Sequence, residues 1–121
     1  MRIASAYSLA EGPAEAAHEA YRSLIGRLGA DPQLLVLYTT EHKADPALIG
    51  ALTNLAPGVQ VVGGTSCGGV MTEAGFHAGP HGAVGLLGVS DPDGAYGVGT
   101  AAVAEDAHSA GARAVERALS A

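Results

Sequence analysis

Leu34-Leu35-Val36-Leu37-Tyr38 is the stretch of sequence on which the fold prediction depends. Successive side chains of a strand point to opposite faces, so an unbroken apolar run places apolar groups on both faces. This pattern is typical of a central strand that is covered by helices on each side. It predicts a layered α/β fold in which the sheet lies between two layers of helices.

The residues before this run predict one strand and one helix. Arg2 to Ser8 is expected to form the strand, and the break at Glu11-Gly12-Pro13 ends it. Pro13 suits the first turn of a helix, where its missing N–H is not needed. Gly29 suits the position that closes the helix. Apolar residues recur between them at three- and four-residue spacing, which predicts one buried face: Ala17, Ala20, Tyr21, Leu24, Ile25 and Leu28.

The residues after the run predict a second helix and a third strand. Asp45 is a suitable N-cap for a helix that Pro46 opens, and Pro57-Gly58 would stop it. The buried stripe of this helix consists of Leu48, Leu52 and Leu55. Val59 to Val62 is expected to be a short strand that Gly63 and Gly64 bring to an end.

The last third of the chain predicts a hairpin and a closing helix. After a loop or small hairpin over Thr65 to Gly82, Val84 to Val89 should form a strand. Asp91-Pro92-Asp93-Gly94 is a strong turn signal, which predicts that Tyr96 to Thr100 pairs back antiparallel. Glu105 to Leu119 is expected to be a helix with acidic residues at its start.

Residues 1–121 are therefore predicted to form a single α/β domain. Its three-layer mixed sheet should begin β-α-β-α-β and continue with an antiparallel hairpin and a C-terminal helix. The first three strands should run parallel, with right-handed crossovers.

Composition limits the classes of function. The chain has 48% apolar and 15% charged residues, which is enough apolar material for one core. Its net charge of -6 argues against nucleic acid and anionic membrane surfaces as partners, because both attract clustered lysine and arginine. The single cysteine allows no intrachain disulfide, and neither a signal peptide nor a membrane-spanning stretch is evident. These features predict a soluble cytoplasmic protein.

The predicted ligand site lies at the carboxyl ends of the parallel strands, where open α/β sheets bind their ligands. The loop Thr39 to Lys43 follows the second strand, and the glycine-rich turn Gly63 to Gly69 follows the third. The turn offers backbone N–H groups that suit a carboxylate or phosphate, although its glycines are equally explained by a sharp turn. The predicted ligand-binding residues are Thr39, Thr40, His42, Gly64, Thr65, Ser66, Cys67, Gly68 and Gly69.

Catalysis is the less favoured alternative. Gly64-Thr65-Ser66-Cys67-Gly68 matches the G-x-S-x-G pattern of hydrolases, but no helix is predicted to follow it. Cys67 would be a nucleophile if His42 lowered its pKa, with His77 or His81 as other partners, whereas a packed thiol is the commoner case. No spacing pattern supports a metal site, and no cofactor is predicted. Lys43 is expected to be a solvated surface cation.

These residues resemble a known family. The apolar run, the Asp-Pro helix, Pro57-Gly58-Val59-Gln60-Val61-Val62-Gly63-Gly64-Thr65-Ser66-Cys67-Gly68 and Thr72-Glu73-Ala74-Gly75 together resemble the FIST N-terminal domain. The resemblance implies a sensory domain that binds small ligands such as amino acids, alone or fused to signalling domains. It places Thr65, Ser66 and Gly68 at the ligand.

The sequence departs from the family pattern in three respects. Cys67 stands where alanine is common, and Gly69 stands where an acidic residue is expected. The chain also stops before a full N-terminal domain would, so we expect a truncated form. The primary hypothesis is a binding domain for a small polar metabolite, as a homo-oligomer or with a signalling partner. An enzyme that uses Cys67 and a ligand-free oligomerising scaffold are the alternatives.

Overall fold

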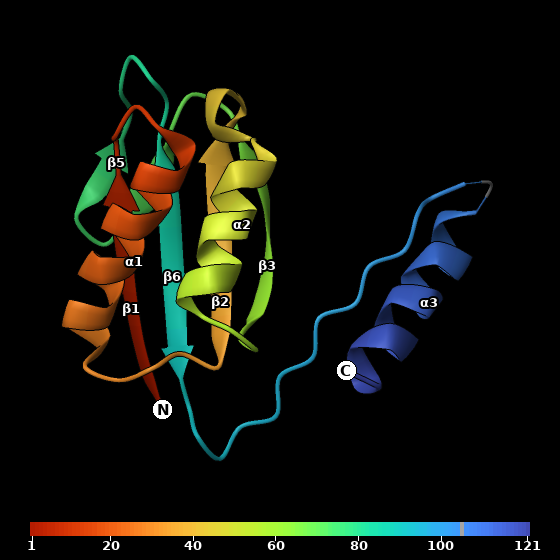
Figure 1. Ribbon diagram of the computed structural model, residues 1–121. Helices are drawn as coiled ribbons and strands as arrows, with labels where there is room; N and C mark the ends of the chain where they lie inside the picture. Colours follow the sequence, from red (N-terminus) through yellow and green to blue (C-terminus); the bar gives the residue numbers. More distant parts are fainter. Residues whose placement is uncertain (105) are drawn as a thin grey trace.

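The computed structural model describes residues 1–104 and 106–121 and has a mixed α/β fold. The predicted class, its β-α-β-α-β start and its C-terminal helix are confirmed (Figure 1). In chain order the elements are β1 (Arg2–Ser8), α1 (Pro13–Leu28), β2 (Leu34–Thr40), the 3-10 helix η1 (Glu41–Lys43), α2 (Pro46–Leu55), β3 (Gln60–Ser66), β4 (Val70–Thr72), β5 (Gly75–His77), β6 (Val84–Ser90) and α3 (Ala107–Leu119).

The main sheet has the strand order β1-β6-β2-β3. β2 and β3 are parallel, and β6 runs antiparallel to both of its neighbours, β1 and β2. The first three strands therefore share one direction, as predicted, but β6 lies between β1 and β2 in the interior of the sheet. All its residues except Leu87 are buried, which suits this position.

Both helices of the body cover the same face of this sheet. α1 contacts β1, β6 and α2, and Figure 1 shows the two helices side by side in front of the strands. The core between these layers is aliphatic and includes Ala20, Leu24, Leu35 and Leu52. Gly88 of β6 allows the close approach of α1, since a Cβ there would lie 2.9 Å from Leu24 Cδ2. Gly29 ends α1 in the left-handed region and Asp45 caps α2, both as predicted.

Within residues 1–104 and 106–121 no helix covers the opposite face of the sheet, so the expectation of helices on both faces is not met. The small β4–β5 hairpin, which matches the hairpin expected within Thr65 to Gly82, lies over one end of this face. Large apolar side chains remain exposed there: Ile3 at 57%, Tyr38 at 51% and Leu87 at 36%. We call this surface the open face.

The fifth strand predicted at Tyr96 to Thr100 does not form. Both edges of β6 are already paired, so this segment cannot form a hairpin with β6. The turn at Asp91 does form, with Gly94 N–H donating to the Asp91 carbonyl at 2.9 Å. Residues 95–104 instead run extended and lead to α3, which stands away from the body (Figure 1). The helix begins after the Asp106 N-cap, whereas the predicted start at Glu105 lies outside the described residues.

β3 continues through the glycines that were expected to end it. It pairs with β2 as far as Thr40 opposite Ser66, so the predicted end at Val62 is wrong. Gly63 lies so close to β2 that an added Cβ would be 1.6 Å from the Leu37 carbonyl oxygen. Only a residue without a side chain fits this position, so the glycine here extends the strand.

We predict that Gly63→Ala lowers the free energy of unfolding by about 1–3 kcal/mol, because the new methyl group overlaps backbone that cannot move freely. The adjacent Gly64→Ala is the matched control, since nothing lies within 4 Å of its added Cβ. Urea unfolding followed by circular dichroism measures both. Equal stability of the two variants would show that β2 and β3 do not approach closely at Gly63.

Candidate functional site

A hollow lies between β3 and α2 at the carboxyl ends of β2 and β3. Its volume is about 440 Å³, and we call it the helix-side hollow. Thr39 and Thr65 face each other across the β2–β3 ladder and both line it. Apolar walls come from Leu37 and the α2 residues Leu48 and Ile49. This position agrees with the strand-end location predicted for a ligand.

The polar groups of the helix-side hollow are two hydroxyls and one carboxylate. Thr39 is buried, and its hydroxyl donates weakly to the carbonyls of Thr40 at 3.2 Å and Ala83 at 3.4 Å. Asp45 Oδ1 accepts from the Ala47 N–H at 2.7 Å, which leaves Oδ2 available at the rim. Within residues 1–104 and 106–121, the Thr65 hydroxyl forms no hydrogen bond with another group of the chain. The hollow can therefore receive hydrogen bonds from a ligand beside an apolar wall.

The strand alternation separates the predicted site residues. Thr65 lines the helix-side hollow, whereas the next residue, Ser66, lines a second hollow on the open face. Thr40 is buried and accepts from the Ala83 N–H at 3.0 Å, and the His42 Cβ lies close to Gly82. The structure thus brings together Thr39, Gly64 and Thr65, and it places Thr40, His42 and Ser66 elsewhere.

The turn from Ser66 to Gly69 is held by its own contacts. The Ser66 hydroxyl donates to the Gly69 carbonyl at 2.6 Å. Gly68 has a φ of 79°, which favours glycine. A Cβ on Gly69 would lie 2.5 Å from the His77 carbonyl oxygen of β5. These contacts give both glycines a structural role, and anion binding by this turn stays a prediction.

The groups named for catalysis are not gathered around Cys67. The cysteine is exposed, and in the described parts of the chain no hydrogen bond joins its thiol to a histidine. His77 stacks on Tyr7 with ring centroids 3.4 Å apart and hydrogen-bonds Thr72 at 2.8 Å. His81 lies 3.9 Å from the Glu11 carboxylate. Within residues 1–104 and 106–121, no three His, Cys, Asp or Glu side chains are placed to hold a metal ion.

Lys43 corrects the expectation of a surface cation. Its side chain is 1% exposed, and its Nζ donates to the Glu11 carbonyl. The apolar stem is packed inside while the ammonium reaches a backbone acceptor, as long cationic side chains often do. The contact ties η1 to the loop after β1, so it fixes two of the three strand ends at this edge of the sheet.

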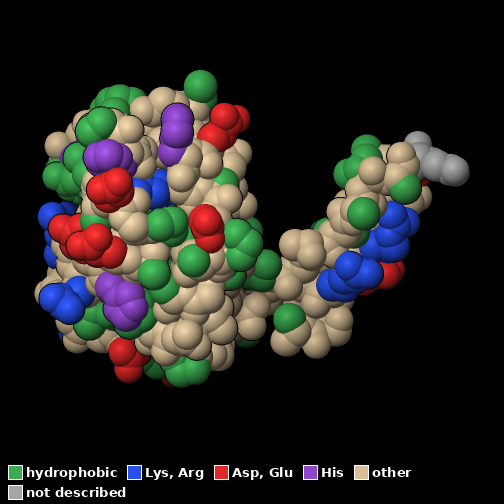
Figure 2. Space-filling view, turned by 45° about the horizontal axis from the view of Figure 1, so that its top comes forward, with side chains coloured by type: hydrophobic (Ala, Val, Ile, Leu, Met, Phe, Trp, Pro, Cys, Tyr) green, Lys and Arg blue, Asp and Glu red, His purple; other side chains and the backbone are tan. Residues whose placement is uncertain are grey.

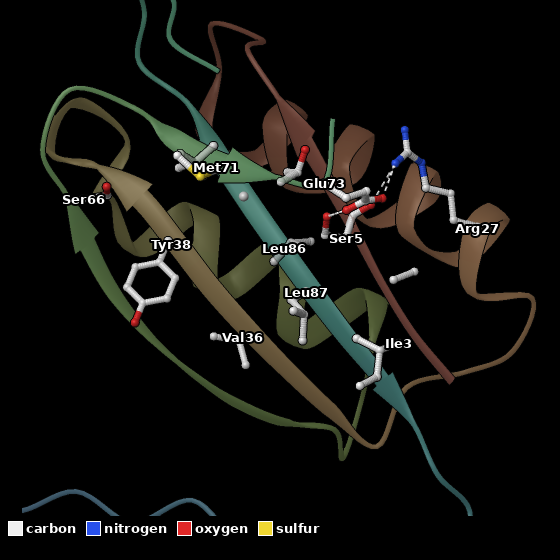
Figure 3. A pocket seen from close by; sticks show the side chains of 14 residues that line it. Ile3, Ser5, Arg27, Val36, Tyr38, Ser66, Met71, Glu73, Leu86 and Leu87 are labelled. Atoms are coloured by element: carbon white, nitrogen blue, oxygen red, sulfur yellow. Dashed lines mark hydrogen bonds and ion pairs between the residues drawn. The ribbon is translucent and has the colours of Figure 1, made fainter. Parts of the chain in front are cut away.

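The second hollow, on the open face, was not anticipated from the sequence. It has a volume of about 1150 Å³ and is shown in Figure 3. Its floor includes Val36, Tyr38 and Leu87, and we call it the open-face hollow. Tyr38 stands opposite Gly64 on one side and Gly85 on the other, which leaves space around its ring. The two glycines that pair with Tyr38 could have indicated this hollow, but their pairing can be recognised only when the strand register is known.

A polar cluster closes one side of the open-face hollow. Ser5 and Arg27 both donate to the Glu73 carboxylate, with the Arg27 contact at 2.8 Å (Figure 3). The Ser5 hydrogen bond is the main cause that lowers the pKa of Glu73 below its ordinary value, and Arg27 adds to it. Because Glu73 belongs to the segment joining β4 and β5, this cluster fastens the hairpin to β1 and α1.

A comparison with protein-family models matches the FIST N domain to residues 33–121. The chain belongs to the FIST N domain family. No curated protein and no solved structure matches it. The FIST match begins just before β2, so it includes β2, α2, β3 and most residues of both hollows. FIST domains are in general sensory and ligand-binding domains, and the resemblance seen in the sequence is confirmed. No helix in the described parts of this FIST domain is both long and apolar enough to cross a membrane.

We predict that the anchoring of the hairpin weakens in acid. A carboxylate whose pKa is lowered by folding stabilises the native state fully above its unfolded pKa of about 4.5, and the effect is lost as the pH falls through the folded pKa. The thermal midpoint of the native chain should therefore fall more between about pH 6 and pH 3 than that of Glu73→Gln. Identical pH profiles would show that the cluster does not fasten the hairpin.

Proposed function

We propose that this FIST domain binds a small metabolite in the helix-side hollow. The observation that carries the proposal is the pairing of Thr39 with Thr65 at the carboxyl ends of two parallel strands, beside a hollow of about 440 Å³. Sites for small molecules commonly measure about 300–1,000 Å³ and combine apolar walls with a few polar groups. The helix-side hollow fits that description in size, location and chemistry.

The lining favours a ligand that has an amino group and an apolar portion. The free oxygen of the Asp45 carboxylate would pair with an ammonium group, and the Thr65 hydroxyl would add a hydrogen bond. Leu48 and Ile49 would pack against an aliphatic side chain. An amino acid meets these requirements, which agrees with the ligand class implied by the family. The turn at Gly68 and Gly69 would then support the site from outside it.

Sensing requires that ligand binding alters something a partner can recognise. The helix-side hollow lies between the edge strand β3 and helix α2, so a ligand would favour one arrangement of these two elements. We infer that the output passes to another copy of the chain or to a signalling domain. A reducing compartment such as the cytoplasm suits the exposed single cysteine.

A thermal-shift screen against the common amino acids and other small amines tests the proposal. A ligand present at about 100 times its Kd should stabilise the domain by roughly 2.7 kcal/mol. We expect Thr65→Val to reduce the shift strongly, because the mutation removes a hydroxyl from the helix-side hollow while its size is kept. Thr53→Val on α2 is the matched control, since Thr53 donates to its own helix at the Ile49 carbonyl.

A second variant identifies which face holds the ligand. Ser66→Ala changes the neighbouring residue on the opposite face and should leave the shift intact. If Ser66→Ala removes the shift and Thr65→Val keeps it, the ligand lies on the open face and the proposed location is wrong. If no amine or amino acid produces a shift, the proposed ligand class is wrong.

A further inference from the structure

The open face is an apolar sheet surface that lacks a covering layer. Ile3, Val36, Tyr38 and Leu87 come from three strands and form one surface over the floor of the open-face hollow (Figure 3). Sheets bury each apolar face against another element, and contiguous exposed apolar patches mark interaction sites. The β4–β5 hairpin covers only one end, so the rest of the face is available for an elongated partner.

Helix α3 is amphipathic and presents an apolar stripe to solvent. One side of it lies against the extended segment before it, where an added Cβ on Gly97 or Gly99 would meet the carbonyls of Ala118 and Ala114 within 2 Å. Val115 and Leu119, one helical turn apart, stay exposed at 59% and 83%. A helix that presents such a stripe to solvent is typical of one that packs on another surface.

The helix and the open face match in length. A helix of 13 residues is about 20 Å long, and strands of seven residues are about 23 Å long. Arg113 and Arg117 of α3 donate to carbonyls of the extended segment, on the side of the helix opposite Val115 and Leu119, so the exposed apolar stripe carries no charge.

The segment that carries α3 directs it away from its own body. At its start Gly94 N–H donates to the Asp91 carbonyl, and the Tyr96 hydroxyl donates to the Asp91 carboxylate at 2.9 Å. Further along, Arg117 donates to the Thr100 carbonyl at 2.5 Å and Arg113 donates to the Ala102 carbonyl at 3.4 Å. The extended segment and α3 thus form one arm, which stands clear of the body in Figure 2.

We propose that the arm of one copy places α3 on the open face of a second copy, and that the exchange is reciprocal. Such an isologous dimer buries the open face and the apolar stripe of α3 in both copies. It supplies from a partner the second layer that each chain lacks. This interface is separate from the helix-side hollow, so it does not depend on the proposed ligand.

Light scattering after size-exclusion chromatography tests the dimer. The native chain should elute with twice its mass of 11.9 kDa, whereas Leu87→Glu and Leu119→Glu should each elute with the single-chain mass. Ile49→Glu is the control, because it places the same charge on an exposed apolar residue of α2, across the sheet. Circular dichroism confirms that each variant is folded. A native monomer, or a dimer that survives both substitutions, would overturn the proposal.

Cysteine cross-linking separates exchange from folding back within one chain. In a Cys67→Ser background, Leu87→Cys and Val115→Cys each place one thiol near the middle of β6 or α3. Mixing the two single variants under mild oxidation should give a disulfide-linked heterodimer. A cross-link that forms only within the double variant, with none in the mixture, would show that α3 covers its own sheet. No cross-link in either case would show that α3 does not use this face.

Discussion

The structure depends on one strand, β6, which pairs with β1 and β2 at the same time. β1 and β2 do not touch each other in the ladder, so the main sheet has no continuity without residues 84–90. These residues follow nearly everything else in the body, and their pairing with Arg2 to Ser8 is the most distant in sequence. The β1–β6 pairing therefore carries a larger loop-closure entropy than pairings between strands that are closer in sequence.

The insertion of β6 also determines what the rest of the chain can do. Both of its edges are used, so the segment after it cannot pair back on β6, and it leaves the body as an arm. The alternating side chains of the sheet then give two unlike surfaces. One is covered by α1 and α2 and ends in a small hollow with threonine hydroxyls, and the other is broad, apolar and open. Thr65 and Ser66 are consecutive in sequence but belong to these different surfaces.

Local signals in the sequence were sufficient for the elements whose ends are decided locally. Gly29 and Asp45 ended and began helices as predicted, because cap geometry depends on a few adjacent residues. The extent of β3 was not predictable in this way, because Gly63 is a strand residue only by virtue of its closeness to Leu37 of β2. The helix-side hollow lies at the end of the sheet where the ligand site was predicted. The separation of Thr65 and Ser66 onto different faces was not predicted, since it depends on how far β3 extends.

The apolar run in β2 predicts helices on both faces of the sheet, whereas in the single chain α1 and α2 cover one face. Leu35 and Leu37 face α1 and α2 and are buried, as a two-sided apolar strand requires, while Tyr38 on the other side is half exposed. A strand that carries apolar residues on both faces is chemically suited to a sheet with two covering layers. The hairpin covers one end of the open face, and among the helices of the described residues α3 is the one that stands away from the sheet. Placing α3 of a second copy on the open face satisfies the strand pattern, the exposed stripe of the helix and the direction of the arm together.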